Sequence, residues 1–390
     1  MKKLLFFIFI TASINIYSQK EANVWYFGRN AGIDFNSGTA STVNNGLLNT
    51  DEGCSSIADE NGNLLFYSDG INVWTANHQL MKYTNGTLAN NLEGNPSSTQ
   101  SGLIIPNPED ENIYYIFTVG TDFVGNSAYP SNPGFNYYTI DISQGNGGEI
   151  IAGPVDLANE RSNLWSEKVT AVQGADCSEL WVLSIVQDTF YAYKIDGNGV
   201  QDTTPITSTT NYFLQDKRGY LKVSPDGTKI ALADFTNSGN GRLVLFDFDN
   251  TTGIVSSSGT ILTNGSSDGS PYGVEFSQQS TKLYSSLYKG NFNDINNFKI
   301  LQYDLLELDI ASTKTQIWSE NGFRGALQLG PDGKIYASVP DRTYLGAIEN
   351  PEANAVNINY NSNAISLGSG ISSQGLPPFI QSFVAPVNLI

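Results

Sequence analysis

Histidine, cysteine and positive charge are scarce in this chain of 390 residues, which has one histidine, two cysteines and 20 lysines and arginines. Because zinc and most transition metals are held by converging His, Cys and carboxylate side chains, the composition argues against a metal site. The single histidine, His78, lies between Trp74 and Met81, where a packing role is more typical than a ligand or a catalytic base. The glycine pattern of a nucleotide-binding loop is missing too. The sequence therefore predicts no metal, no cofactor and no catalytic residue.

Long apolar runs are also missing after the first residues. No later stretch approaches the roughly 20 apolar residues of a membrane-spanning helix, so we expect no membrane span in the mature chain. With 38 acidic residues, the net charge of -18 would repel nucleic-acid phosphates, and we expect no nucleic-acid partner. Charged residues make up 15% of the chain and aromatic residues 12%, a balance that favours strands joined by polar turns over helical bundles.

The first residues have the order of a secretory signal peptide. Lys2 and Lys3 precede an unbroken apolar run over residues 4–10, and Ser18 offers a small residue at a plausible cleavage point. A buried N-terminal strand is the alternative. We expect residues 1–18 to be removed and residues 19–390 to be secreted or displayed on the cell surface, with the periplasm as another location. A lipid anchor is not expected, because no cysteine follows the cleavage point.

One pattern recurs along the rest of the chain: an apolar strand, a tight polar turn and a second apolar strand. Residues 221–232 and 326–337 are the clearest copies, both with Pro-Asp-Gly at the turn, where proline fixes φ and glycine accepts a positive φ. Residues 274–284 are a degraded copy, and looser copies begin at residues 56, 103 and 171. The copies are about 45 to 65 residues apart, which is the spacing of β-propeller blades.

These copies, with strand-like segments left over at both ends, predict an all-β protein with a single β-propeller domain over residues 19–390. We expect seven blades of four antiparallel strands, closed by joining N-terminal and C-terminal strands, because closure removes exposed sheet edges. Six blades with capped ends is the alternative. We expect the propeller to be a monomer.

Equivalent positions in the repeats lead to two further expectations. Lys222, Glu275 and Gln328 occupy the same place in successive innermost strands, so we expect buried polar contacts near the channel. Cys54 precedes one innermost strand and Cys177 follows another, which places them at opposite rims, too far apart for a disulfide.

Several segments resemble a family of exported surface proteins from Bacteroidota-type bacteria, often described as gliding-motility-associated. The segments that carry the resemblance are residues 25–28, 32–35, 52–56, 61–67, 167–171, 327–336 and 375–382. In that family the corresponding region is an N-terminal propeller, usually followed by adhesion modules and a C-terminal sorting domain for type IX secretion. The resemblance implies a propeller fold and export, here without the sorting domain, and it implies no reaction.

Candidate ligand sites are few. Asp59 and Asp196 begin segments that look faintly like calcium loops, but their Asn-Gly and Asp-Gly pairs are more typical of hairpin turns. Trp25 and Trp181 lie within strand patterns and are expected in the core. Trp165, in a polar segment after Arg161, is the best candidate for an exposed aromatic residue. We predict that Trp165 and Arg161 contact a ligand.

The leading hypothesis is a non-catalytic extracellular or cell-surface propeller that binds a glycan or an envelope protein. Long segments at residues 121–133 and 197–212 would form variable loops on the rims of the ring. The first alternative is a glycoside hydrolase or lyase centred on the channel, which requires acidic groups that converge on one rim with shifted pKa values. The second alternative is a structural spacer of a truncated surface protein.

Overall fold

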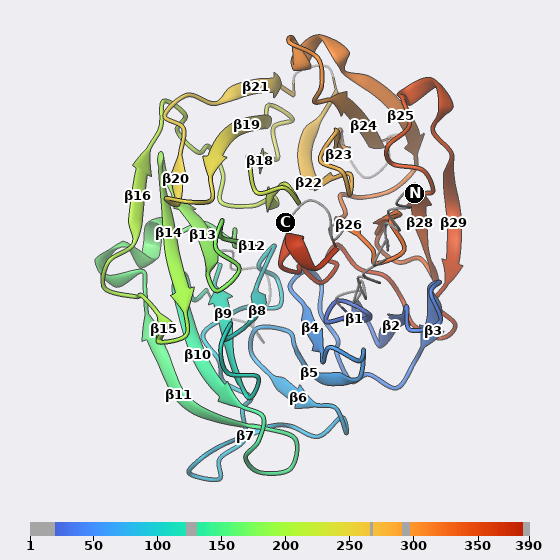
Figure 1. Ribbon diagram of the computed structural model, residues 1–390. Coiled ribbons are helices and arrows are strands. Elements are labelled where there is room, and N and C mark those ends of the chain that lie inside the picture. The colour runs from blue at the N-terminus through green and yellow to red at the C-terminus, as the bar shows by residue number, and fades with distance from the viewer. Residues whose placement is uncertain (1–19, 122–130, 266–267, 291–296, 385–390) are drawn as a thin grey trace, which may run out of the picture.

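Seven β-sheets are arranged as blades around a central axis in the computed structural model, which describes residues 20–121, 131–265, 268–290 and 297–384 (Figure 1). The predicted all-β fold with a single seven-bladed propeller is therefore confirmed, and the six-bladed alternative is wrong. The expected signal peptide, residues 1–18, and most of the segment 121–133 lie outside the described residues. The helices within the described ranges are all too short to cross a membrane.

Each blade is built from strands that lie close together in the sequence, and we number the blades in chain order. Blades 1 and 2 consist of β1 (Val24–Phe27), β2 (Ala31–Asp34) and β3 (Ser41–Val43), and of β4 (Ser55–Ala58), β5 (Leu64–Ser68) and β6 (Val73–Thr75). Blade 3 consists of β7 (Lys82–Tyr83), β8 (Gly102–Pro106), β9 (Ile113–Val119), β10 (Phe135–Asp141) and β11 (Glu149–Asp156). Blade 4 consists of β12 (Thr170–Gln173), β13 (Leu180–Val186), β14 (Thr189–Asp196), β15 (Gly199–Val200) and β16 (Ile206–Thr209).

The second half of the ring continues in the same way. Blade 5 consists of β17 (Leu221–Val223), β18 (Lys229–Asp234), β19 (Arg242–Asp249), β20 (Ile254–Val255) and β21 (Thr260–Thr263). Blade 6 consists of β22 (Ser270–Phe276), β23 (Lys282–Tyr288), β24 (Phe298–Asp304) and β25 (Thr315–Glu320). Blade 7 consists of β26 (Leu327–Leu329), β27 (Ile335–Ala337), β28 (Tyr344–Ile348) and β29 (Tyr360–Ser366). The helices are short 3-10 turns, namely η1 (Asn159–Leu164), η2 (Ile310–Thr313), η3 (Ala355–Asn357) and η4 (Gln381–Val384).

The blades have three to five strands rather than the uniform four that we expected. Blades 4 and 5 have a divided outer edge, since β15 and β16 both pair with β14, and β20 and β21 both pair with β19. The segment 197–212, expected as a loop, supplies β15 and β16. Blade 3 adds β7, which pairs in parallel with β11. The number varies because a long outer strand leaves a free edge with which connecting segments can pair.

The Pro-Asp-Gly turns form as predicted. In blade 5 the backbone N–H of Gly227 donates to the carbonyl of Ser224 (2.8 Å), and Gly227 has a φ of 70°, a conformation that favours glycine. In blade 7 the N–H of Gly333 donates to Gly330 (2.9 Å) in the same way. In blades 2 to 7 the innermost strand is therefore followed by a turn that lies on one face of the ring. We call this face the turn rim, and the opposite face, where chain segments enter the innermost strands, the loop rim.

The two ends of the chain meet as expected, but not as paired strands of one blade. Arg29, after β1, and Ile371 exchange two backbone hydrogen bonds of 2.9 and 3.0 Å as an isolated bridge. The described part of the chain then runs into the centre of the ring, where η4 lies (Figure 1), with Phe379 packed on Trp25 at 5.8 Å between ring centroids. The described tail adds no strand to blade 1, because its two adjacent prolines, residues 377 and 378, have no N–H to donate to a ladder.

The expected polar contacts in the channel are confirmed. The Nζ of Lys222 donates to Glu275 (3.0 Å) in the next blade and to the side-chain oxygen of Gln328 (2.5 Å) in the blade after that. All three side chains are buried. Glu275 also accepts from the backbone N–H groups of Phe276 and Leu329, so its carboxylate is compensated from two blades. Polar groups in the innermost strands therefore link successive blades across the channel.

The two cysteines are not paired, as expected. Cys54 is buried at the loop-rim end of β4, and burial raises the pKa of its thiol. Cys177 is exposed in the turn after β12, on the turn rim. Trp25 and Trp181 are both buried in the core, also as expected.

Candidate functional site

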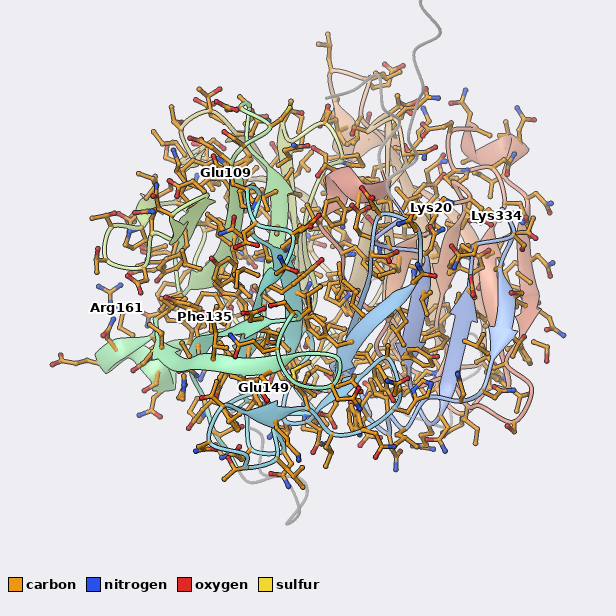
Figure 2. The ribbon with its side chains drawn as sticks, turned by 60° about the horizontal axis from the view of Figure 1, so that its bottom comes forward. Lys20, Glu109, Phe135, Glu149, Arg161 and Lys334 are labelled. Carbon is orange, nitrogen blue, oxygen red and sulfur yellow. The ribbon has the colours of Figure 1, made fainter. Side chains whose placement is uncertain are left out.

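A groove of about 710 Å³ lies between the outer parts of blades 3 and 4. It is lined by the end of β11, the η1 helix, the middle of β14 and the segment that leads into β16. Both residues that the sequence singled out, Arg161 and Trp165, line this groove. Figure 2 shows Arg161 at the outer edge of the molecule and Phe135, from β10, further in.

The backbone after β11 turns sharply to place η1 over the groove. The carboxylate of Asp156 accepts hydrogen bonds from the N–H groups of Ala158 (2.8 Å) and Asn159 (3.1 Å), and Asn159 adopts a φ of 49°. Aspartate at such a position stabilises the turn that precedes a helix. The N–H of Trp165 then donates to the carbonyl of Arg161 (3.1 Å), so η1 presents Arg161 outward and returns Trp165 to the interior.

Trp165 is buried, and the expectation of an exposed aromatic residue is wrong. Its ring is only 2% exposed and packs on Phe135 and Tyr191, each with a centroid distance of 5.2 Å. Its Nε1 donates to the hydroxyl of Ser184 (2.8 Å), which satisfies the one polar atom of the buried side chain. The tryptophan therefore belongs to a rigid aromatic floor beneath the groove.

Arg161 is the exposed cation of the groove. Its guanidinium carbon lies 5.2 Å from the centroid of Tyr191, a cation–π contact that orients the side chain. Within the described residues the guanidinium forms no ion pair, although Asp156, Glu160 and Asp202 line the same groove. Asp202 accepts a hydrogen bond from the hydroxyl of Tyr137 (2.9 Å) and is thereby held in place.

A second polar cluster lies at the loop rim and joins two buried glutamates. Glu167 accepts from the N–H (3.0 Å) and the hydroxyl (2.9 Å) of Thr99 with one oxygen and from the hydroxyl of Thr121 (2.5 Å) with the other. Glu52 accepts from Arg324 (2.9 Å) and Tyr272 (2.9 Å) and lies 3.4 Å from the same Thr99 hydroxyl. Thr99 therefore bridges the two carboxylates.

Burial controls the electrostatics of this cluster. Desolvation raises the pKa of Glu167 to about 7, and the negative charge of Glu52 raises it in the same direction. Arg324 compensates Glu52 and stacks over Phe235 at 4.6 Å and Tyr272 at 5.0 Å. Every carboxylate oxygen has a donor and both glutamates are buried, so the cluster is complete without a ligand.

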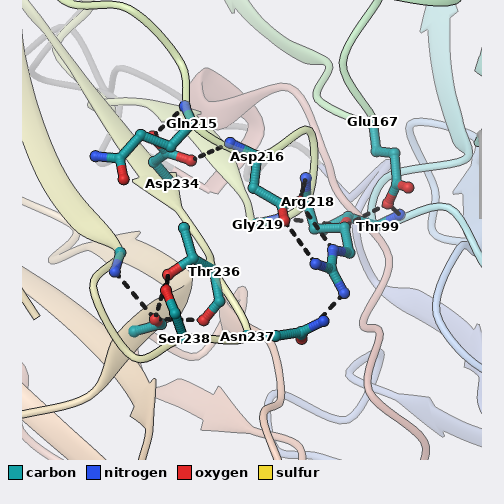
Figure 3. A network of polar contacts seen from close by, with 12 residues as sticks. Thr99, Glu167, Gln215, Asp216, Arg218, Gly219, Asp234, Thr236, Asn237 and Ser238 are labelled. Carbon is teal, nitrogen blue, oxygen red and sulfur yellow. Dashed lines mark hydrogen bonds and ion pairs between the residues drawn. The ribbon is translucent and has the colours of Figure 1, made fainter.

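The neighbouring part of the loop rim is held in the same manner. Lys168 is buried, and its Nζ donates to the carbonyls of Arg218 (2.5 Å), Gly219 (2.7 Å) and Ala233 (2.9 Å). Desolvation lowers the pKa of this lysine to about 8. Figure 3 shows polar contacts of the adjoining segment, in which Asp234 accepts from the backbone of Asp216, and Asp216 binds the guanidinium of Arg218. The three hydrogen bonds of Lys168 join blade 4 to blade 5.

Sequence reasoning did not assign a role to these loop-rim residues, although a signal was present. Glu52, Thr99, Glu167, Arg218 and Arg324 each lie three residues before the first residue of an innermost strand. Equivalent positions in a ring of repeats converge on one rim. A comparison of polar residues at this single offset could therefore have identified the cluster, and two of its members lie in segments 52–56 and 167–171.

The turns that looked like calcium loops are hairpin turns. Asp59 accepts from the N–H groups of Asn61 (2.9 Å) and Asn63 (2.8 Å), and Asp196 accepts from Asn198 (2.8 Å). Within the described part of the chain, no three His, Cys, Asp or Glu side chains are placed to hold a metal ion. His78 packs beside Tyr67, whose hydroxyl lies 3.1 Å from the Nδ1 of the ring.

Comparisons with known proteins support the fold. No family model matches the chain, and no curated protein matches it. A putative 6-phosphogluconolactonase from Bacteroides uniformis is similar in structure, with 12% sequence identity and a TM-score of 0.52 over 90% of this chain and 98% of that one. A periplasmic gluconolactonase from Pseudomonas aeruginosa has 16% identity and a TM-score of 0.43, over 66% of this chain and 70% of that one. At 12% identity and a TM-score of 0.52, the likeness to the first of these structures shows the propeller fold alone.

Proposed function

We propose that this protein is a non-catalytic binding propeller that holds a neutral carbohydrate in the groove between blades 3 and 4. The observation that carries the proposal is the exposed guanidinium of Arg161, which lies over Tyr191 in a groove lined by three carboxylates. A guanidinium offers only donors and a carboxylate only acceptors. Sugar hydroxyls both donate and accept, so one polyhydroxylated ligand can satisfy both kinds of group.

The charges of the groove favour a neutral ligand over an ionic one. Asp156, Glu160 and Asp202 would repel a polyanion, as would the net charge of -18 on the whole chain. The positive charge of Arg161 would repel a cation in the same groove. The aromatic residues beneath the groove keep its shape fixed, which lowers the cost of ordering the site when a ligand binds.

The location and partners of the protein are part of the same proposal. The apolar run at residues 4–10 and the resemblance to exported surface propellers support secretion or display on the cell surface. A glycan of the cell envelope or of the surroundings is the partner that this location offers. We propose that the propeller acts as a monomer there.

Binding of the purified chain to neutral polysaccharides by affinity electrophoresis tests the proposal. We expect Arg161→Ala to weaken binding at least about tenfold, the effect of removing one charge-assisted hydrogen bond. The matched control is Arg242→Ala, because Arg242 also lies over a tyrosine ring, Tyr212, at 6.0 Å but outside the groove. Retention of full binding by Arg161→Ala, or no binding by the unmodified chain, would contradict the proposal.

A second candidate function is hydrolysis at the loop rim. The observation in its favour is the convergence of Glu52 and Glu167, with a pKa of about 7 for Glu167, since a carboxyl group with such a pKa can act as a general acid. Burial and complete hydrogen bonding place this function second, because a substrate would have to displace existing donors. Turnover of glycosides or lactones that Glu167→Gln abolishes would establish this function in place of the first.

A further inference from the structure

A second cavity, of about 520 Å³, opens on the turn rim, where the turns of blades 2, 3 and 4 meet Phe383 of η4. We call it the turn-rim cavity. Its wall includes the turn at residues 59–61, the turn at residues 106–112, and Leu180 and Phe383. It is separate from the groove at Arg161, and the two have no lining residue in common.

The charge of the turn-rim cavity is of one sign. Glu21, Asp59, Glu60 and Glu111 line it, and neither a lysine nor an arginine is among its lining residues. Burial raises the pKa of Glu21, and the nearby charges of Glu60 and Asp59 raise it further. The carboxylates are therefore close enough to repel one another.

Several buried acceptors at this rim have no partner in the described structure. One carboxylate oxygen of Glu21, Oε2, is buried and accepts no hydrogen bond, and neither does the side-chain oxygen of Gln173. Gln173 also lines an adjoining cavity of about 90 Å³, together with Ser382, which is 2% exposed and whose hydroxyl is unpartnered. An unpartnered buried acceptor costs about 1–3 kcal/mol, so these positions favour a ligand that donates hydrogen bonds.

Part of the wall is apolar. Leu65, Tyr114, Leu180 and Phe383 line the cavity together with the four carboxylates and with polar side chains such as Asn61 and Gln173. Acidic groups above an apolar wall match a side chain that has a cationic end and an aliphatic stem, because such a stem packs on apolar surface while its charge stays at the rim. A bare metal ion fits less well, since the described residues supply no group of three closely placed ligands.

We propose that the turn-rim cavity binds a lysine side chain of a basic peptide segment in a partner protein. The ammonium group donates to Glu21 and is attracted by Glu60 and Glu111, while its four methylene groups pack against Tyr114 and Leu180. This interaction goes beyond carbohydrate binding and uses a different face of the ring, so the propeller would connect a glycan to a protein.

Titration calorimetry of the full chain with tetralysine tests the proposal. We expect saturable binding in low salt, none with the fully acetylated peptide, and weaker binding of spermidine, which lacks the stem and backbone of a peptide. We expect Glu60→Gln combined with Glu111→Gln to weaken tetralysine binding at least about fivefold, through loss of two opposite charges. Both residues are exposed, so this variant keeps the fold.

The matched control combines Glu93→Gln with Glu307→Gln, which makes the same change in net charge at two exposed glutamates outside the cavity. The proposal requires this control to bind tetralysine like the unmodified chain. Equal weakening by both variants would show that net charge alone attracts the peptide and would overturn the proposal. Absence of tetralysine binding would overturn it as well, and tighter binding of spermidine would assign the cavity to free polyamines instead.

Discussion

Two groups of carboxylates lie at opposite rims of the ring, and they differ in what surrounds them. At the loop rim, Glu52 and Glu167 receive hydrogen bonds from threonine, tyrosine and arginine side chains of other blades. At the turn rim, Glu21 keeps a buried oxygen without a donor, and its neighbours Asp59 and Glu60 add negative charge. Burial of acidic groups therefore has two meanings in this molecule. Complete hydrogen bonding marks a structural junction, and the leftover acceptors support the ligand site that we propose.

The largest expected effect tests the structural role of the loop rim. Arg324→Ala removes the cation beside Glu52 and leaves a buried carboxylate uncompensated, so we expect a loss of about 3–5 kcal/mol in the free energy of unfolding. Urea denaturation measures this loss. The control is Arg29→Ala, whose ion pairs with Asp51 and Asp341 are exposed, and which we expect to cost less than about 1 kcal/mol. Equal effects of the two substitutions would show that burial gives the Arg324–Glu52 pair no special structural role.

The next largest effect is the pH dependence that Glu167 imposes on the free energy of unfolding. Its pKa is raised from 4.5 to about 7 in the folded state, so folding favours the protonated form. The stability from this proton is fully present below pH 4.5 and is lost as the pH rises to about 7. We expect the unfolding free energy of the unmodified chain to fall by up to about 3 kcal/mol relative to Glu167→Gln across this window. If the unfolding free energies of the two chains, measured by denaturation at several pH values, change in parallel, folding does not raise the pKa of Glu167.

The smallest effect tests the turn rim and has the opposite sign. Glu21→Gln removes a charge that Glu60 and Asp59 repel, so we expect the free energy of unfolding at pH 8 to rise by up to about 1 kcal/mol. The control is Glu307→Gln, which changes an exposed glutamate and should have no measurable effect. A loss of stability with Glu21→Gln would mean that this carboxylate has a partner in the fold, which would make the two rims alike.

Much of the architecture could be predicted because its causes are local. Residues 221–232 and 326–337 alternate apolar strands with Pro-Asp-Gly turns, and such patterns specify a hairpin wherever it lies in the fold. The repetition of the hairpin predicted the seven-bladed ring. The equivalent positions of Lys222 and Glu275 within the repeats predicted their contact. These predictions needed only the repeat and its order along the chain.

The candidate sites could be predicted less well because burial there depends on other blades. Trp165 follows a polar segment, yet Phe135 from blade 3 and Ser184 from blade 4 enclose it. The sequence identified Arg161 and Trp165 as a pair but could not show that one is exposed and the other buried. The turn-rim cavity was missed altogether, since three turns and the C-terminal segment must come together to form it.

The strands, the turns and the closed ring follow from the amino-acid sequence, because hydrophobic alternation and turn residues act over a few neighbouring positions. Which polar groups are compensated and which are left over depends on the assembled fold. The compensating donors and charges come from distant parts of the chain, as Arg324 does for Glu52. Burial sets the strength of these interactions. Pairing across the ring therefore separates the acidic residues that hold this propeller together from those that can receive a ligand.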